Sequence, residues 1–135
     1  MLLASLSFLD FLKVFAGFVF AILFLQSGLD KVIDYKGNLA WICSYFEPTP
    51  LKKIAKTLFI LLTITEIFAG LFSLIGSTSM FFFEKDYFLK AGIAFAAFSL
   101  HFVFTGQRMA KDYTSAAHTI SYMAVAMLAW FIMAQ

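Results

Sequence analysis

Four long apolar segments, separated by short polar ones, dominate this sequence. We expect helices that cross a membrane over about residues 8–29, 51–76, 87–105 and 114–133. Each covers about 20 residues, the length that a helix needs to cross the hydrocarbon core of a bilayer. The connections are short, which favours neighbouring helices of opposite direction. The sequence therefore predicts a single all-α integral membrane domain over residues 1–135, an antiparallel four-helix transmembrane bundle.

The composition supports a membrane protein and excludes several other classes. Hydrophobic residues make up 62% of the 135 residues and charged residues 13%, against about half and about a quarter in ordinary globular domains. No soluble catalytic domain fits in a chain this short and apolar. The net charge of +2 is small and the basic residues are scattered, so we expect no nucleic-acid partner. The single cysteine, Cys43, excludes an intrachain disulfide and an all-thiolate metal site.

The first connection, residues 30–50, predicts a short amphipathic helix that lies in the membrane interface. Asn38 is its expected N-cap, and Tyr45 is an expected interfacial anchor. Thr49 and Pro50 are then typical of a helix start, with threonine as the cap and proline at the first helical position. The apolar face of the interfacial helix comprises Leu39, Ile42, Cys43 and Phe46.

The first span carries two features that predict local contacts. Asp10 and Lys13 are three residues apart and can pair near the start of the helix. Gly17 and Ala21, four residues apart, form a strip of small residues where a second helix can approach closely.

Glu66 lies close to the middle of the second span. An isolated carboxyl at that depth either stays protonated or finds a cation. Its helical face is shared with Thr63, Ala69, Gly70 and Ser73. Because these residues are small or polar, we expect Glu66 to point into the bundle. Two interpretations remain open: Glu66 bonds to a neighbouring hydroxyl and fixes helix packing, or it carries protons or binds a ligand in a cavity shared with His101.

A polar segment, residues 106–113, separates the third and fourth spans, with His101 before it and His118 after it. The predicted topology brings this segment and the end of the first span to one membrane boundary. The candidate ligand-binding residues at that boundary are Gln26, Lys31, Arg108, Asp112, Tyr113 and His118. In one interpretation Arg108 and Asp112 pair with each other and cap helix ends. In the other, His101 and Glu66 are catalytic residues of a quinone site, since a histidine and a carboxylate can bond both quinone carbonyls and carry protons.

Haem and metal sites are weaker alternatives. Two histidines on adjacent helices could supply both axial ligands of a haem. Each histidine is only about one turn from the connection, and no further motif supports haem, so haem is disfavoured. Glu66, His101 and His118 lack the spacing of three or four residues that is typical of zinc or di-iron sites. We therefore expect no metal.

The distribution of basic residues predicts the orientation. Seven of the ten Lys and Arg residues lie in the first and third connections or their flanks. The positive-inside rule then places these connections in the cytoplasm and both termini outside.

Three short motifs resemble the DoxX-like family of small four-span bacterial membrane proteins. They are the segment Phe24–Lys31, which reads FLQSGLDK, then Glu66 followed by Gly70, and GQR with KDY within residues 106–113. The resemblance covers nearly the whole chain in order and spacing. It implies a multi-pass protein of the bacterial inner membrane, and with the charge distribution it implies periplasmic termini.

The resemblance implies an association with redox systems, because relatives include membrane parts of quinone-linked oxidoreductases. We expect a small membrane subunit that binds quinone in the bundle and is, if catalytic, part of such an oxidoreductase. The alternative is a non-catalytic accessory or assembly subunit that stabilises a larger membrane complex. Under both functions we expect the protein to contact the lipid bilayer and other membrane or redox protein subunits. Relatives that assist disulfide chemistry are expected to have paired cysteines, and the lone Cys43 departs from that pattern.

Overall fold

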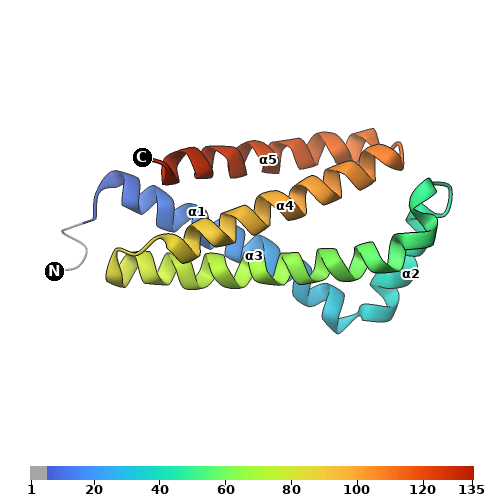
Figure 1. The fold of residues 1–135 in the computed structure, drawn as a ribbon, viewed down its shortest axis with the longest axis horizontal. Coiled ribbons are helices and arrows are strands. Elements are labelled where there is room, and N and C mark those ends of the chain that lie inside the picture. The colour runs from blue at the N-terminus through green and yellow to red at the C-terminus, as the bar shows by residue number, and fades with distance from the viewer. Residues whose placement is uncertain (1–5) are drawn as a thin grey trace.

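The computed structural model describes residues 6–135, and this part of the chain is helical with no strand (Figure 1). This confirms the all-α fold class. The elements in chain order are α1 (Phe8–Ile33), α2 (Tyr35–Phe46), the 3-10 helix η2 (Pro50–Ile54), α3 (Ala55–Phe83), α4 (Tyr87–Met109) and α5 (Tyr113–Met133).

Within residues 6–135, four helical segments are long and apolar enough to cross a membrane. They are α1, the continuous segment η2–α3, α4 and α5, with lengths of 26, 34, 23 and 21 residues. They support the prediction of a multi-pass membrane protein whose outer surface contacts lipid.

The helices extend further than the sequence predicts. α1 continues to Ile33, α3 to Phe83 and α4 to Met109, so much of residues 77–86 and 106–113 is helical rather than loop. α3 ends where Glu84 adopts a left-handed backbone with φ of 56°. Lys111, just beyond α4, has φ of 59°. The backbone hydrogen bonds of a helix do not depend on whether its side chains are apolar or polar. A helix can therefore continue past its apolar span until the backbone leaves the helical conformation.

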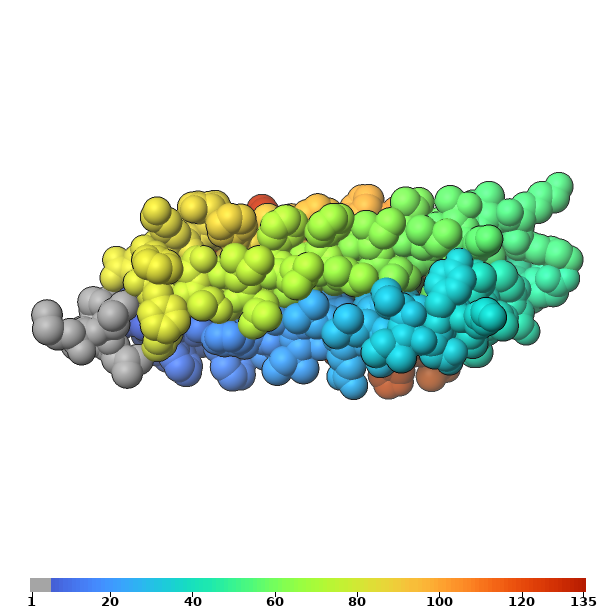
Figure 2. All heavy atoms as spheres, turned by 90° about the horizontal axis from the view of Figure 1, so that it is seen from below, coloured from blue at the N-terminus to red at the C-terminus, as the bar shows by residue number. Residues whose placement is uncertain are grey.

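α3 is the central helix, because it packs along both α1 and α4, whereas α5 packs mainly on α4. The start of α1 and the end of α5 lie at one end of the molecule, with α2 and the α4–α5 turn at the other (Figure 1). Figure 2, which views the molecule from below, shows α1 lying beside α3. The core cluster comprises Phe20, Phe24, Ala69, Leu89, Ile93, Ala96, Leu100, Ala126, Ala129 and Met133.

Glycines let α3 approach its neighbours closely. A Cβ atom on Gly70 would lie 2.7 Å from the backbone nitrogen of Leu25 in α1, and one on Gly92 of α4 would lie 2.5 Å from the nitrogen of Ser73. The predicted strip of small residues is also confirmed, because Gly17 and Ala21 are both buried. Membrane helices lack a hydrophobic driving force towards each other, so such close backbone packing is a main source of their association.

The first connection contains the predicted short helix, α2, with a different cap. Asp34 rather than Asn38 is the N-cap, and the Asp34 side chain accepts a hydrogen bond from the Gly37 nitrogen at 3.1 Å. Asn38 instead donates to the Asp34 carbonyl at 2.9 Å. α2 begins directly after α1 and earlier than the prediction, so its cap falls on Asp34, the residue between the two helices.

Two other local predictions are confirmed. Thr49 caps η2 by accepting a hydrogen bond from the Leu51 nitrogen at 3.1 Å, and Pro50 is the first helical residue. Asp10 and Lys13 form an ion pair at 4.0 Å. Both depend on residues only two or three positions apart, so helix geometry alone determines them.

Candidate functional site

Glu66 forms an ion pair inside the bundle. Its side chain comes from α3, and the residue is only 4% exposed. The Lys31 Nζ atom on α1 lies 2.9 Å from Glu66 Oε2, and the Ser27 hydroxyl donates to Glu66 Oε1 at 3.1 Å. We call Ser27, Lys31 and Glu66 the buried clamp, because they join α1 to α3.

The sequence of α1 builds its side of the clamp. Ser27 and Lys31 are four residues apart, so they lie on one helical face. Lys31 donates to the Ser27 hydroxyl at 2.8 Å and to the Ser27 carbonyl at 3.2 Å. Gly28 lies between them, and a Cβ atom there would lie only 3.3 Å from the backbone nitrogen of Ile67, the residue after Glu66. The absence of a side chain at Gly28 therefore brings the two helices close enough for the ion pair.

The clamp neutralises two charges that would each be costly alone. A charged side chain within the hydrocarbon depth is retained when it is paired and hydrogen-bonded. Here Glu66 has a cation and a hydroxyl donor, and Lys31 has a carboxylate and two oxygen acceptors. The chemical capacity of this group is thus to hold α1 on α3, because the three ammonium hydrogens and the Ser27 hydroxyl hydrogen are all engaged within it.

The predicted inward face of the second span is confirmed. Thr63, Glu66, Ala69, Gly70 and Ser73 are all buried. The Thr63 hydroxyl donates to the Phe59 carbonyl of its own helix at 2.7 Å. The regular spacing of small and polar residues was a sufficient signal for this face, because helix periodicity alone determines which residues share it.

His101 is not placed against Glu66. Ser99 on α4 faces α3, since its hydroxyl donates to Thr65 at 2.9 Å. His101 follows Ser99 by two residues, which corresponds to a rotation of about 200° around the helix axis. His101 therefore points away from α3, and it is exposed. The prediction that Glu66 and His101 face one cavity is therefore wrong. Spacing determines the face that residues share within a helix, whereas packing determines how that helix is rotated. A catalytic role for either residue stays a prediction.

The other candidate residues at this boundary do not converge on one site. His118 on α5 and Gln26 on α1 are exposed, as are Arg108 and Tyr113. Of the candidate ligand-binding residues, only Lys31 contacts Glu66.

A second polar linkage joins α2 to the start of α5. The Tyr45 hydroxyl donates to Asp112 Oδ2 at 2.9 Å, and the Ser115 nitrogen donates to Asp112 Oδ1 at 3.2 Å. We call Tyr45, Asp112 and Ser115 the boundary clasp. Sequence reasoning assigned Tyr45 an anchoring role and missed its partner, because 67 residues separate it from Asp112 and no local pattern connects them.

The boundary clasp shifts the titration of both its ionisable groups. Burial, and then the hydrogen bond to Asp112, raise the pKa of Tyr45 from 10.0 to about 12. Hydrogen bonds from Ser115, and then from Tyr45, lower the pKa of Asp112. Each shift favours the state in which a neutral tyrosine donates to a carboxylate.

The predicted Arg108–Asp112 ion pair is wrong. Asp112 is the N-cap of α5 and accepts from Ser115 and Tyr45. Arg108 lies over the Tyr113 ring, with its guanidinium carbon 4.5 Å from the ring centroid. The left-handed backbone at Lys111 reverses the chain between the two residues, so the spacing of four residues no longer places them on one helical face.

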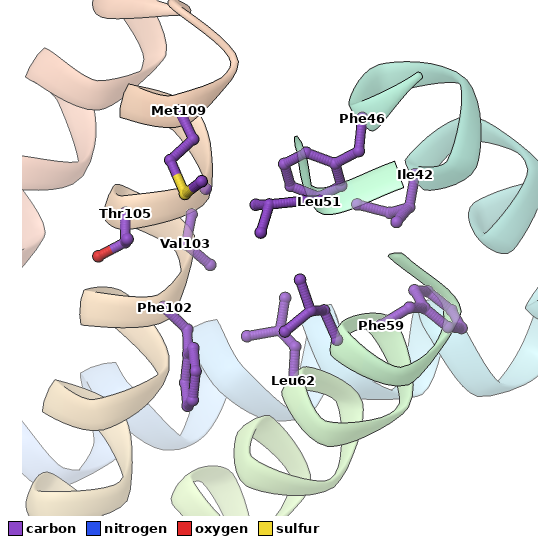
Figure 3. A pocket seen from close by; sticks show the side chains of 11 residues that line it. Ile42, Phe46, Leu51, Phe59, Leu62, Phe102, Val103, Thr105 and Met109 are labelled. Atoms are coloured by element: carbon purple, nitrogen blue, oxygen red, sulfur yellow. The ribbon is translucent and has the colours of Figure 1, made fainter. Parts of the chain in front are cut away.

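An apolar pocket lies between α2, η2, α3 and α4, with a volume of about 210 Å³. Figure 3 shows the side chains that line it and the space between them. Its larger lining residues are Phe46, Leu51, Phe59, Leu62, Phe102 and Met109. In Figure 3 the hydroxyl of Thr105 points away from this space. Sequence reasoning missed the pocket, because it forms only where four separate elements meet.

Within residues 6–135 no group of three or more His, Cys, Asp or Glu side chains is arranged to hold a metal ion. Comparison with protein-family models, with curated proteins and with solved structures finds no match to this chain. The resemblance to DoxX-like proteins therefore stays a prediction based on the three motifs.

Proposed function

We propose that this protein is a non-catalytic accessory subunit that stabilises a larger, redox-associated complex in a bacterial inner membrane. The observation that carries this proposal is the position of His101. It is exposed on α4, eight residues before the end of that helix, or about 12 Å from it. Polar side chains at such depth usually face protein or water rather than lipid. A helix of another subunit would supply that protein surface.

The surroundings of His101 support the same interpretation. Its outward face on α4 contains several small and polar residues besides the exposed Phe98. These are Ala94, Ala97, His101, Thr105 and Arg108. Small residues permit close helix approach, and polar ones can bond across an interface.

The buried clamp also favours a structural role. The charge of Glu66 is already balanced by Lys31 inside the same chain, so Glu66 needs no ligand to be stable. In this proposal the four spans form an antiparallel bundle, and α2 lies in the membrane interface. Both termini are periplasmic, as the excess of Lys and Arg near α2 and the α4–α5 turn suggests.

The test is site-specific photo-cross-linking in native membranes. A cross-linking amino acid at His101 is expected to trap one defined protein partner, whereas the same group at Ile64, an exposed residue on the outer face of α3, is expected to trap lipid. His101→Leu is expected to reduce co-purification of that partner while the chain itself stays folded. Equal co-purification with wild type and His101→Leu would refute the proposal.

The second candidate is the quinone-binding subunit that the family resemblance implies. Its supporting observation is the pair of half-buried donors beside Glu66, the Lys31 ammonium and the Ser27 hydroxyl. Quinone carbonyls accept hydrogen bonds, so in this candidate a quinone would take over one of the bonds that these donors now make to Glu66. The expected result is that purified protein retains quinone and that Glu66→Gln or Lys31→Met loses it. Unchanged quinone content in both variants would exclude this candidate and leave the accessory role.

A further inference from the structure

The apolar pocket between α2, η2, α3 and α4 is suited to a hydrocarbon chain. An apolar cavity of this size, about 210 Å³, can hold a nonpolar group without bound water. Phe102 and Met109 face Leu51 and Leu62 across the space (Figure 3). With the Thr105 hydroxyl turned away, the lining offers no side-chain donor for a polar headgroup. The ligand class indicated is therefore an alkyl chain rather than a quinone ring.

The pocket lies where a lipid chain would enter from the membrane surface. The continuous segment η2–α3 has 34 residues, or about 50 Å, which exceeds the ~30 Å hydrocarbon core of a bilayer. Its first turns contain Lys52, Lys53 and Lys56, so this is the end that we place at the headgroup level. Leu51 lines the pocket in η2, and Leu62 lines it further along α3. The lining thus extends from the headgroup level towards the bilayer interior.

Basic side chains surround the same end of the molecule. Lys53 and Lys56 are exposed beside the lining residues of η2 and α3, and Arg108 is exposed next to Met109. The nearby acids are already occupied. Glu47 pairs with Lys52, and Asp112 accepts from the boundary clasp. The positive charge of Lys53 and Lys56 is therefore available to an anionic headgroup.

We propose that the pocket binds one acyl chain of an anionic phospholipid whose phosphate lies at the level of Lys53 and Lys56. Hydrocarbon burial supplies the affinity, and the lysines supply the preference for negative charge. This inference is independent of the accessory role, because it rests on the pocket lining and on Lys53 and Lys56 rather than on His101.

The test uses the full chain reconstituted in vesicles of equal phosphatidylglycerol and phosphatidylcholine with matched chains, followed by native mass spectrometry. Wild type is expected to retain one phosphatidylglycerol molecule. Val103→Trp fills the pocket and is expected to lower retention by about tenfold. The matched control is Ile64→Trp, which adds the same ring on an exposed part of α3 and is expected to retain lipid like wild type. Equal retention by Val103→Trp and wild type would overturn the proposal.

The headgroup preference is tested separately. Lys53→Gln and Lys56→Gln are each expected to reduce the preference for phosphatidylglycerol about fivefold, whereas Lys85→Gln, an exposed lysine between α3 and α4, should leave it unchanged. If Lys53→Gln and Lys56→Gln both kept the wild-type preference for phosphatidylglycerol, the proposed position of the phosphate beside these lysines would be wrong. Retention of an isoprenoid quinone in place of phospholipid would overturn the choice of ligand.

Phe46→Trp retains an aromatic side chain in the pocket and adds a fluorescent reporter there. Quenching of this reporter tests lipid binding without a variant that fills the pocket. Phe46 is 7% exposed, so bulk lipid has little access to it. Phosphatidylglycerol with brominated chains is expected to quench the added tryptophan signal, measured against wild type, more strongly than brominated phosphatidylcholine. Equal quenching by both lipids would contradict the proposal.

Discussion

The buried clamp and the boundary clasp have similar chemistry in different surroundings. Each consists of one carboxylate with two hydrogen-bond donors, and each joins segments far apart in the sequence. Glu66 in the buried clamp is only 4% exposed, whereas Asp112 in the boundary clasp lies at the surface and caps a helix.

This difference teaches how much the surroundings decide the importance of a polar contact. Inside the bundle, no water replaces a lost partner, so removal of one partner leaves an uncompensated charge. At the boundary, water and lipid headgroups can replace a lost hydrogen bond at small cost. The same type of bond is therefore expected to matter much more in the buried clamp.

The largest expected effect is that of Glu66→Leu. Loss of the carboxylate leaves the half-buried Lys31 ammonium without its counter-charge, so the free energy of unfolding is expected to fall by about 3 kcal/mol, the lower end of the range for a fully buried pair. The measurement is reversible unfolding by sodium dodecyl sulfate in mild detergent micelles.

The control for this prediction is the double variant Glu66→Leu/Lys31→Met, which removes both charges. It is expected to recover most of the lost stability, because apolar replacements of a buried ion pair are often neutral. A double variant as unstable as Glu66→Leu would show that the Lys31 charge is not the cause.

The next effect tests whether the buried clamp needs the close approach of α1 and α3. Gly70→Ala places a Cβ atom 2.7 Å from the Leu25 backbone nitrogen, so the helices must separate. We expect a loss of about 1–3 kcal/mol, despite the better helix propensity of alanine. Ala124→Leu, on the exposed side of α5, serves as the control for added volume and is expected to change stability little. A more stable Gly70→Ala would contradict the close contact.

A smaller effect is expected at the boundary clasp. Tyr45→Phe removes the hydroxyl that donates to Asp112 and is expected to cost about 0.5–1.5 kcal/mol. Tyr122→Phe, at an exposed position on α5, is the matched control. If Tyr45→Phe proves as costly as Glu66→Leu, the contrast between the two linkages fails.

The smallest effect is the pH dependence of the boundary clasp. The lowered pKa of Asp112 gives stability that is present above its unfolded value, about 3.9, and is lost as the pH falls through the folded value. The raised pKa of Tyr45 gives stability that is present below 10.0 and is lost as the pH rises through about 12.

Two variants test this loss of stability at acid and at alkaline pH. Asp112→Asn is expected to flatten the acid side of the stability curve, and Tyr45→Phe the alkaline side. In a titration of tyrosinate absorbance, the difference between wild type and Tyr45→Phe is expected to show one group that titrates near 12. A difference curve centred at the ordinary tyrosine value would argue against the bond to Asp112 in solution.

Much of the fold followed from patterns within single helices. Apolar segments of sufficient length predicted the four spans, and small and polar residues at helical spacing predicted that Glu66 is buried. The caps at Thr49 and the pair Asp10–Lys13 were also predictable, since each depends on neighbours within one turn. These features need only the geometry of one helix.

The sequence by itself thus determined the four long apolar helices of residues 6–135, which face of α3 is polar and that Glu66 needs a partner. Only the tertiary structure decided that this partner is Lys31, that His101 faces outward and that Tyr45 meets Asp112. The physical reason is that helix periodicity relates residues within one helix. The rotation and tilt of one helix against another depend on packing at contacts such as Gly28 and Gly70.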